Sequence, residues 1–263
     1  MPQSCLHWRG LRLPSRSYTR QRIGRRWPIP NWPGGRRLVR DLLEARSGVY
    51  HAASNSGDDS AHAPPRDSQA HGTYFLYNNW DFNALGTIFE QQTGRNIYDA
   101  FETDLARPLA MEDFDRGAQR KSGNLGKSMH PAYHIRISTR DLARVGYLML
   151  REGNWAGRQI VPRDWVKEST RVITPVAQMN TAAARRGPLG YGYLWWVWDA
   201  QWAAGPFAGA CTAHGLGGQH LSVLPALDIV VAHQTRGSET GTHPAFWKLL
   251  EMLTRAKCGK TLC

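Results

Sequence analysis

Four short apolar runs in the C-terminal part of the chain constrain its fold more than any other feature. They occupy residues 190–199, 206–213, 220–225 and 229–235, and aromatic, β-branched or small residues dominate each run. Glycine and proline separate them, as turns between antiparallel strands require. The segment that follows, residues 243–257, has the apolar spacing of an amphipathic helix. We therefore predict an antiparallel sheet packed by a terminal helix.

The residues before these runs predict mainly helices. Residues 38–46 have the pattern of a short amphipathic helix. Asn78 or Asn79 can cap a longer helix that ends at Gly94. Three more helices are expected over 97–109, after Ser138 and over 160–169, the second opened by a capping box of Ser138 and Asp141. A short strand is predicted over 73–77, between loops over 52–72 and 112–131.

Length and hydropathy limit the class of protein. The chain has 263 residues, of which 41% are hydrophobic, enough for one large domain or two modest ones. No apolar run reaches 18 residues, so no transmembrane helix is expected. The basic N-terminus lacks the apolar core of a signal peptide, and the sequence leaves the localisation and the oligomeric state open.

The net charge of +12 is concentrated at the N-terminus. Residues 1–40 contain 10 Arg and no acidic residue, so the rest of the chain is close to neutral. One interpretation is an arm for nucleic acid or an anionic membrane. We favour the alternative that residues 1–37 are an irregular leader outside the fold, and we expect no nucleic-acid partner. An acid-free leader rich in Arg also fits a wrong start site or a shifted reading frame.

Two short motifs carry candidate chemistry. Tyr77-Asn78-Asn79 is a Y-x-N sequence at the start of a predicted helix. His214-Gly215 is followed after one residue by Gly217, Gly218 and Gln219, in a loop between two predicted strands. A tyrosine at the end of a strand and a glycine-rich hairpin are also common structural features. Neither motif identifies a function by itself.

Six segments together resemble the β-lactamase-related serine hydrolases, which include class C β-lactamases, DD-peptidases and related esterases. They are LVRDLLEARSGVY (38–50), YNNWDFNALGTIFEQQTG (77–94), DLARPLAMEDF (104–114), ISTRDLARVGYLMLREGNWAGRQIVPRDWV (137–166), YGYLWW (191–196) and HGLGGQHLSVLPALDIVVAHQ (214–234). The resemblance implies an α/β (α+β) fold of the β-lactamase/transpeptidase type, with a five-stranded antiparallel sheet flanked by helices and a helical lobe. We expect this lobe over about 80–185, the strands over about 190–236, and a partial domain over 38–263 whose N-terminal part is incomplete.

The resemblance also implies roles for the two motifs in a site between the sheet and the lobe. Tyr77 would act as a base and acid if nearby cations lowered its pKa. Asn79 would bind a lysine or the substrate amide, and His214 would replace the lysine of the family's K-[ST]-G element. Gly215, Gly217, Gly218 and Gln219 would let the substrate approach the strand. The expected substrate is a small molecule or a peptide with an amide or ester bond.

The nucleophile motif of this family is absent from the printed sequence. No serine is followed by lysine three residues later, and no G-x-S-x-G sequence occurs; Ser17 has Arg20 at that spacing, and an arginine does not give up its proton. We therefore expect the chain to cover about the C-terminal two thirds of the domain and to be inactive as written. The alternative is a non-catalytic relative that binds a peptide or a cell-wall fragment.

Other motifs are weak, and no cofactor or metal is expected. Gly126-Lys127-Ser128 resembles the end of a phosphate loop, but the first glycine of that motif is replaced by Lys121. His130 and His134 have the spacing of a metal pair, but Pro131 follows His130 and no acidic partner is near in sequence. Cys211 is expected to be a small core residue.

Overall fold

The computed structural model describes residues 39–215, 217–235 and 242–258. The predicted leader over 1–37 therefore lies outside the described residues. The chain divides into two compact units. Unit 1 holds the described residues up to Ala110 together with Asp115–Arg136 and Gln159–Trp165, and unit 2 holds Met111–Phe114, Ile137–Arg158 and the described residues from Val166 onward.

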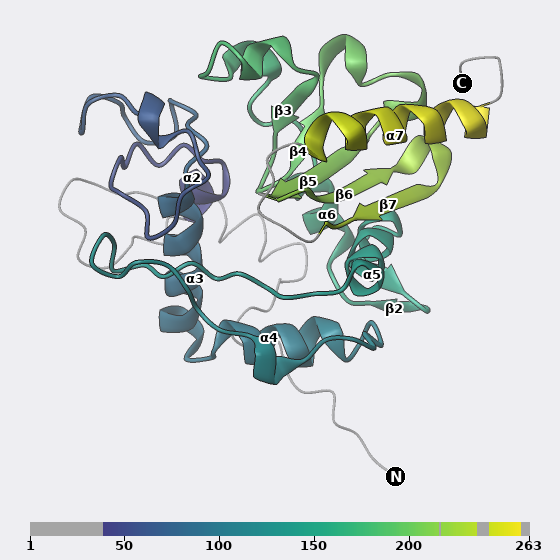
Figure 1. Ribbon diagram of the computed structural model, residues 1–263, viewed down its shortest axis with the longest axis horizontal. Helices are drawn as coiled ribbons and strands as arrows, with labels where there is room; N and C mark the ends of the chain where they lie inside the picture. The colour runs from purple at the N-terminus through teal and green to yellow at the C-terminus, as the bar shows by residue number, and fades with distance from the viewer. Residues whose placement is uncertain (1–38, 216, 236–241, 259–263) are drawn as a thin grey trace. The chain divides into compact units, whose positions relative to one another are not determined.

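Unit 2 is built on a five-stranded antiparallel sheet (Figure 1). Its strand order is β3-β4-β5-β6-β7, which is also the order along the chain, so each strand pairs with the one before it. The strands are β3 (Leu189–Tyr191), β4 (Trp196–Trp198), β5 (Cys211–Gly215), β6 (Gln219–Leu224) and β7 (Ile229–His233). The predicted antiparallel sheet is thus confirmed, and the first apolar run, 190–199, supplies two strands rather than one.

Helices cover both faces of this sheet (Figure 1). The helix α5 (Thr139–Leu150) packs on the face of β6 and β7, where Gly146 lies so close to Leu221 and Val230 that no Cβ would fit. The C-terminal helix α7 (Thr242–Cys258) packs on the other face, where Phe246 stacks on His220 at 4.0 Å between ring centroids. Alternation along β6 explains this arrangement, because successive side chains of a strand point to opposite faces.

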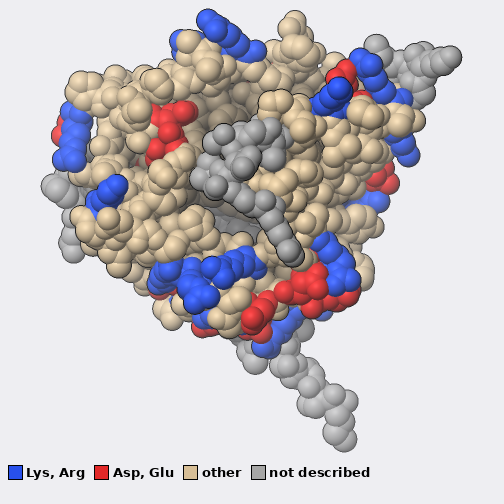
Figure 2. Space-filling model, viewed as in Figure 1, with Lys and Arg blue, Asp and Glu red and all other residues tan. Residues whose placement is uncertain are grey.

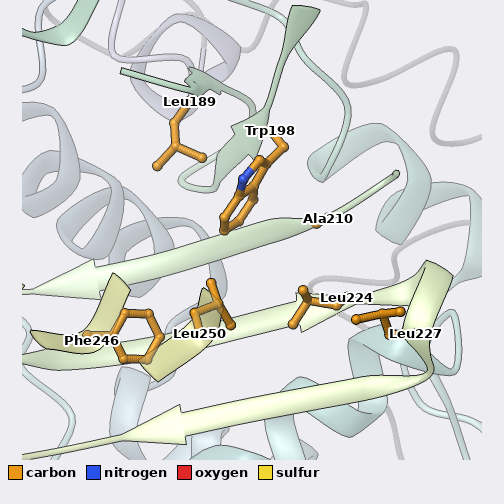
Figure 3. Close-up of a cluster of buried hydrophobic side chains, with 7 residues drawn as sticks. All are labelled: Leu189, Trp198, Ala210, Leu224, Leu227, Phe246 and Leu250. Atoms are coloured by element: carbon orange, nitrogen blue, oxygen red, sulfur yellow. The ribbon is translucent and has the colours of Figure 1, made fainter. Parts of the chain in front are cut away.

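The core of unit 2 lies between the sheet and α7 (Figure 3). Seven buried residues form it: Leu189, Trp198, Ala210, Leu224, Leu227, Phe246 and Leu250. Phe246 and Leu250 come from α7 and are 1% and 2% exposed. Burial of an aromatic or aliphatic side chain of this size stabilises a fold by about 1.5–3 kcal/mol. A smaller cluster of Val197, Cys211 and Val223 lies toward α5, where burial raises the pKa of the Cys211 thiol to about 12.

Unit 1 contains the helices α2 (Val39–Leu43), α3 (Asn79–Thr93) and α4 (Ile97–Phe101). Asn78 caps α3 by accepting a hydrogen bond from the backbone N–H of Asp81 at 2.9 Å, and the helix ends at Gly94 in the left-handed region, φ 66°. Both ends agree with the prediction. Leu42 of α2 packs with Trp80 and Ala84 of α3 in a small apolar core.

Other elements are short. A π-helix (Glu102–Ala106) continues α4, so the helix predicted over 97–109 changes its winding after Phe101. The hairpin of β1 (Asn154–Trp155) and β2 (Arg158–Gln159) precedes α6 (Arg163–Ser169). Short 3₁₀ turns fill the connections: Ser60–His62, Arg116–Ala118, Val176–Gln178, Ala184–Arg186, Ala200–Trp202, Gly205–Phe207 and Pro225–Leu227.

The structure differs from the sequence predictions at three places. Residues 73–77 form no strand; they run as a loop held by hydrogen bonds from Leu76 N to Ala45 O and from Asp59 N to Tyr77 O, both 2.9 Å. In the run 206–213, only the end from Cys211 is a strand. The expected helical lobe over about 80–185 is divided between the units, because α5 packs on the sheet and belongs to unit 2.

Candidate active site

Tyr77 lies in the loop directly before α3, in unit 1. Its side chain is half-buried, and its ring lies against Phe82 of the first turn of α3, with 5.0 Å between ring centroids. Its carbonyl oxygen accepts the hydrogen bond from Asp59 N. The loop over residues 56–60 therefore positions the backbone of Tyr77, and the start of α3 positions its ring.

The surroundings of the Tyr77 phenol are acidic. Burial raises the pKa of Tyr77 to about 12, and the charges of Asp58 and Asp59 add to this effect. Burial also raises the pKa of Asp59, with a smaller opposing effect of His62. The expectation that nearby cations lower the pKa of Tyr77 is thus wrong in this structure. A phenol with such a pKa is protonated at neutral pH, so it can donate a hydrogen bond but is a poor base.

Asn78 and Asn79 have different roles, although both are buried. Asn78 is the cap of α3, and its Nδ2 donates to the carbonyl of Leu76 at 2.9 Å. Asn79 is the first residue of the helix, and its Nδ2 donates to the carbonyl of Ser56 at 2.8 Å. The side-chain amide of Asn79, which we expected to bind a lysine or the substrate, thus donates a hydrogen bond to the 56–60 loop and holds this loop in place.

Asp58 is a residue of this site that the sequence analysis did not single out. Its Oδ2 accepts from the backbone N–H of Asn79 at 2.8 Å, and its Oδ1 accepts from the backbone N–H and the hydroxyl of Ser60. An aspartate placed against the first N–H groups of a helix is favoured by the helix dipole. The signal in the sequence was the pair Asp58-Asp59 inside a loop of small residues, but only the fold brings this pair to Tyr77.

His214 lies on β5 in unit 2, and its ring is on the face of the sheet that α7 covers. It stacks on Trp196 at 4.9 Å between ring centroids and meets Trp247 of α7 edge-on at 6.5 Å. In register, His214 pairs with His220 on β6, and His220 pairs with His233 on β7. Three histidines thus form a row across the strands, next to aromatic rings of α7. Alternation puts Ala213, not His214, on the face toward α5.

Hydrogen bonds from three side chains hold the backbone at Gly217 and Gly218, which precede β6. Gly217 and Gly218 are buried and both have φ 78°, a left-handed conformation that favours glycine. The carbonyl of Gly217 accepts from Thr235 Oγ1 and from Gln219 Nε2, and that of Gly218 accepts from His233 Nδ1 at 3.0 Å. Gly215 pairs with Gln219 across the hairpin. The glycines thus permit a tight turn, and the side chain of Gln219 supports it.

The candidate residues belong to different units. Tyr77 and Asn79 are in unit 1, whereas His214, Gly215, Gly217, Gly218 and Gln219 are in unit 2. The structure brings the members of each group together. Their assignment as site residues stays a prediction. Among the residues that the structure describes, no three or more His, Cys, Asp or Glu are arranged to hold a metal ion, and no helix is long and apolar enough to cross a membrane.

Comparison with known proteins assigns the fold. A family model described as Beta-lactamase matches residues 19–252, which is most of the chain and begins inside the segment that we expected to be a leader. The chain therefore belongs to the β-lactamase family of serine hydrolases. The observed sheet, with helices on both of its faces, agrees with this fold class.

Solved structures share this fold at low sequence identity. A protein described as a 6-aminohexanoate-dimer hydrolase from Bacillus anthracis is 18% identical, with a TM-score of 0.62 over 87% of this chain and 63% of that one. A β-lactamase from Mycobacterium bovis is 18% identical, with a TM-score of 0.60 over 88% and 77%. Simvastatin synthase from Aspergillus terreus is 14% identical, with a TM-score of 0.59 over 86% and 70%. The chain thus spans less than two thirds of the length of the first of these proteins.

Proposed function

We propose that this chain is a serine hydrolase of the β-lactamase family by descent, directed at an amide or ester bond through acyl-enzyme chemistry, and that its 263 residues alone do not perform that reaction. Family membership supports the first part of the proposal. The second part rests on the sequence, because no serine is followed by lysine at the spacing that this chemistry uses.

The environment of Tyr77 is the structural observation that supports the second part of this proposal. In acyl transfer, a base must take the proton of the nucleophile, and a tyrosine can do so at neutral pH only if a positive charge lowers its pKa. Here burial, with the carboxylates of Asp58 and Asp59, raises the pKa of Tyr77 to about 12. A phenol with this pKa stays protonated at neutral pH and is a poor base for the proton transfer that starts the reaction.

Turnover and acylation test the proposal directly. We expect the purified chain to hydrolyse neither a chromogenic β-lactam nor a nitrophenyl ester above the rate in buffer, and intact-mass spectrometry should find no adduct after incubation with a penicillin or a fluorophosphonate. Tyr77→Phe and the parent chain should behave alike. Robust turnover that Tyr77→Phe abolishes would show that the proposal is wrong.

A second candidate function is binding of a peptide or a cell-wall fragment without catalysis. The turn at Gly217 and Gly218 favours it, because three hydrogen bonds to the carbonyls of these two residues hold their backbone before any ligand arrives. Calorimetric titration with a peptide ending in two D-alanines tests it. Binding that Gly218→Ala weakens at least tenfold, while Tyr77→Phe leaves it unchanged, would favour this function. No detectable binding would exclude this ligand.

A further inference from the structure

Residues 119–136 of unit 1 form a hairpin whose two arms are tied together at three places. Ser122 and Ala132 exchange two backbone hydrogen bonds, N to O, at 3.0 and 2.9 Å. The Oγ of Ser122 is 2.7 Å from Nδ1 of His134. At the base, the buried side chain of Gln119 donates to the carbonyl of Arg136 and accepts from its N–H, both at 2.8 Å. The hairpin is therefore a defined element.

Large apolar side chains point into solvent on this hairpin. Leu125, within the turn at the tip, is 63% exposed, Met129, two residues after the turn, is 79% exposed, and Ile135 near the base is 38% exposed. The turn is fixed by a hydrogen bond from Lys127 N to Asn124 O, and Asn124 N donates to Ser54 O at 2.8 Å. Exposed leucine and methionine on an ordered tip leave apolar surface in water, which is unfavourable unless something covers it.

The same hairpin is rich in cations. The segment over 116–136 contains five Lys or Arg residues and no Asp or Glu. Arg116 and Lys121 are paired with Asp99 and Glu90. Arg120, Lys127 and Arg136 are exposed and have no ion pair within the part of the chain that the structure describes. Figure 2 shows Lys and Arg side chains gathered in the area where Figure 1 draws the segment between α4 and α5.

We propose that the hairpin 119–136 docks this protein on an anionic lipid surface. Leu125 and Met129 enter the boundary between headgroups and acyl chains, while Arg120, Lys127 and Arg136 meet the lipid phosphates. Apolar side chains among unpaired cations match such a surface, which is negatively charged above an apolar layer. Nucleic acid would use the cations but leave Leu125 and Met129 in water, since recognition there relies on phosphate contacts and aromatic stacking.

The helix α7 supplies a matched control for the apolar part. Its Met252 is 60% exposed, so Met129 and Met252 are the same residue type at similar exposure. Near Met252, Arg255 pairs with Glu251, an acidic residue of a kind that the hairpin lacks, and Lys248 lies one helical turn earlier. If exposure of a methionine were sufficient for lipid contact, both positions would contribute. The proposal assigns the contact to Met129, because the hairpin surrounds it with Arg120, Lys127 and Arg136 and has no acidic residue over 116–136.

Vesicle sedimentation with the full chain tests the proposal. Binding to phosphatidylcholine vesicles with about one quarter phosphatidylglycerol should exceed binding to pure phosphatidylcholine at least tenfold. The double variant Leu125→Asn/Met129→Asn should weaken binding about tenfold or more, whereas Met252→Asn should leave it unchanged. Replacing Arg120, Lys127 and Arg136 by Gln should weaken it on the order of 100-fold, about fivefold for each charge. Circular dichroism of each variant confirms that it is folded.

The basic N-terminal segment requires its own control, since it contains 10 Arg. Replacing Arg12, Arg16 and Arg20 by Gln removes the same number of charges as the hairpin variant, and it should weaken binding much less. Equal loss in the two triple variants would overturn the proposal, and so would vesicle binding that does not depend on Leu125 and Met129. Binding to duplex DNA or to an acidic peptide, with none to vesicles, would also overturn it and identify a different partner.

Discussion

Around Tyr77 the side chains are joined by hydrogen bonds to carboxylates and amides, whereas around His214 they are joined by contacts between rings. Asp58, Asn78 and Asn79 fix the start of α3 through directional polar bonds. Trp196 and Trp247 surround His214 instead. The first arrangement depends on directional hydrogen bonds, and the second depends on buried apolar area. Two motifs that the family resemblance assigns to one site are thus stabilised by different forces.

The largest expected effect comes from a substitution in the aromatic packing near His214. Phe246→Ala removes the ring that stacks on His220 and is 1% exposed in the core of unit 2. We expect the free energy of unfolding to fall by about 3–5 kcal/mol, from lost burial and the cavity that remains. Urea unfolding measures it. Met252→Ala on the exposed face of α7 should change it by less than about 0.5 kcal/mol. Similar losses in both variants would contradict the packing of α7 described above.

An intermediate effect is expected from the titration of Tyr77, as a change of stability with pH. Burial and nearby carboxylates raise the pKa of Tyr77 to about 12 in the folded chain, against about 10 for an exposed tyrosine. Below pH 10 both states keep the proton, so the shift changes nothing there. Above it, the unfolded chain loses the proton first, and stability should fall by at most about 3 kcal/mol as the pH approaches 12. Unfolding of the parent chain and of Tyr77→Phe across this range isolates the effect, which the variant should lack.

The carboxylates near Tyr77 supply the control for this prediction. Asp58→Asn removes one of the charges that raise the pKa of Tyr77. The phenolate absorbance of Tyr77 should therefore appear at a lower pH in Asp58→Asn than in the parent chain. An unchanged titration would show that the charge of Asp58 does not contribute to the raised pKa.

The smallest effect concerns the cap of α3. Asn78→Ala removes the acceptor for the N–H of Asp81, and we expect a loss of about 1 kcal/mol in the free energy of unfolding. Asn78→Ser retains an oxygen that can accept this bond, so it should restore most of the loss. Thermal or urea unfolding of the two variants distinguishes capping from packing. Equal losses would mean that burial of Asn78, not its cap, stabilises the helix.

Local patterns were sufficient to predict most of the fold. The caps at Asn78 and Ser138, the stop at Gly94 and the strands after residue 189 follow from side-chain chemistry within a few residues. The strand predicted over 73–77 is wrong because no strand pairs with it among the described residues, and its backbone bonds go to single residues of neighbouring loops. Its composition is compatible with a strand, but a strand also needs a partner.

The candidate site was less predictable, because its properties depend on contacts distant in sequence. Tyr77 and Asn79 were identified by their motif, but the Asp58 contact that sets their surroundings lies 21 residues before Asn79. His214 was selected as a cation for a substrate. Side chains alternate between the two faces along β5, and the ring of His214 is on the face toward α7. There it contacts Trp247, which is 33 residues later in the sequence.

The sequence by itself determined the family, the antiparallel sheet with its terminal helix, and the absence of a Ser-x-x-Lys pair from these 263 residues. These depend on local periodicity and on residue order, which the sequence states directly. Only the tertiary structure decided that Tyr77 lies among carboxylates and that His214 lies among aromatic rings. A pKa depends on burial and on charges across space, and the direction of a side chain depends on what packs against its strand, so neither follows from a motif.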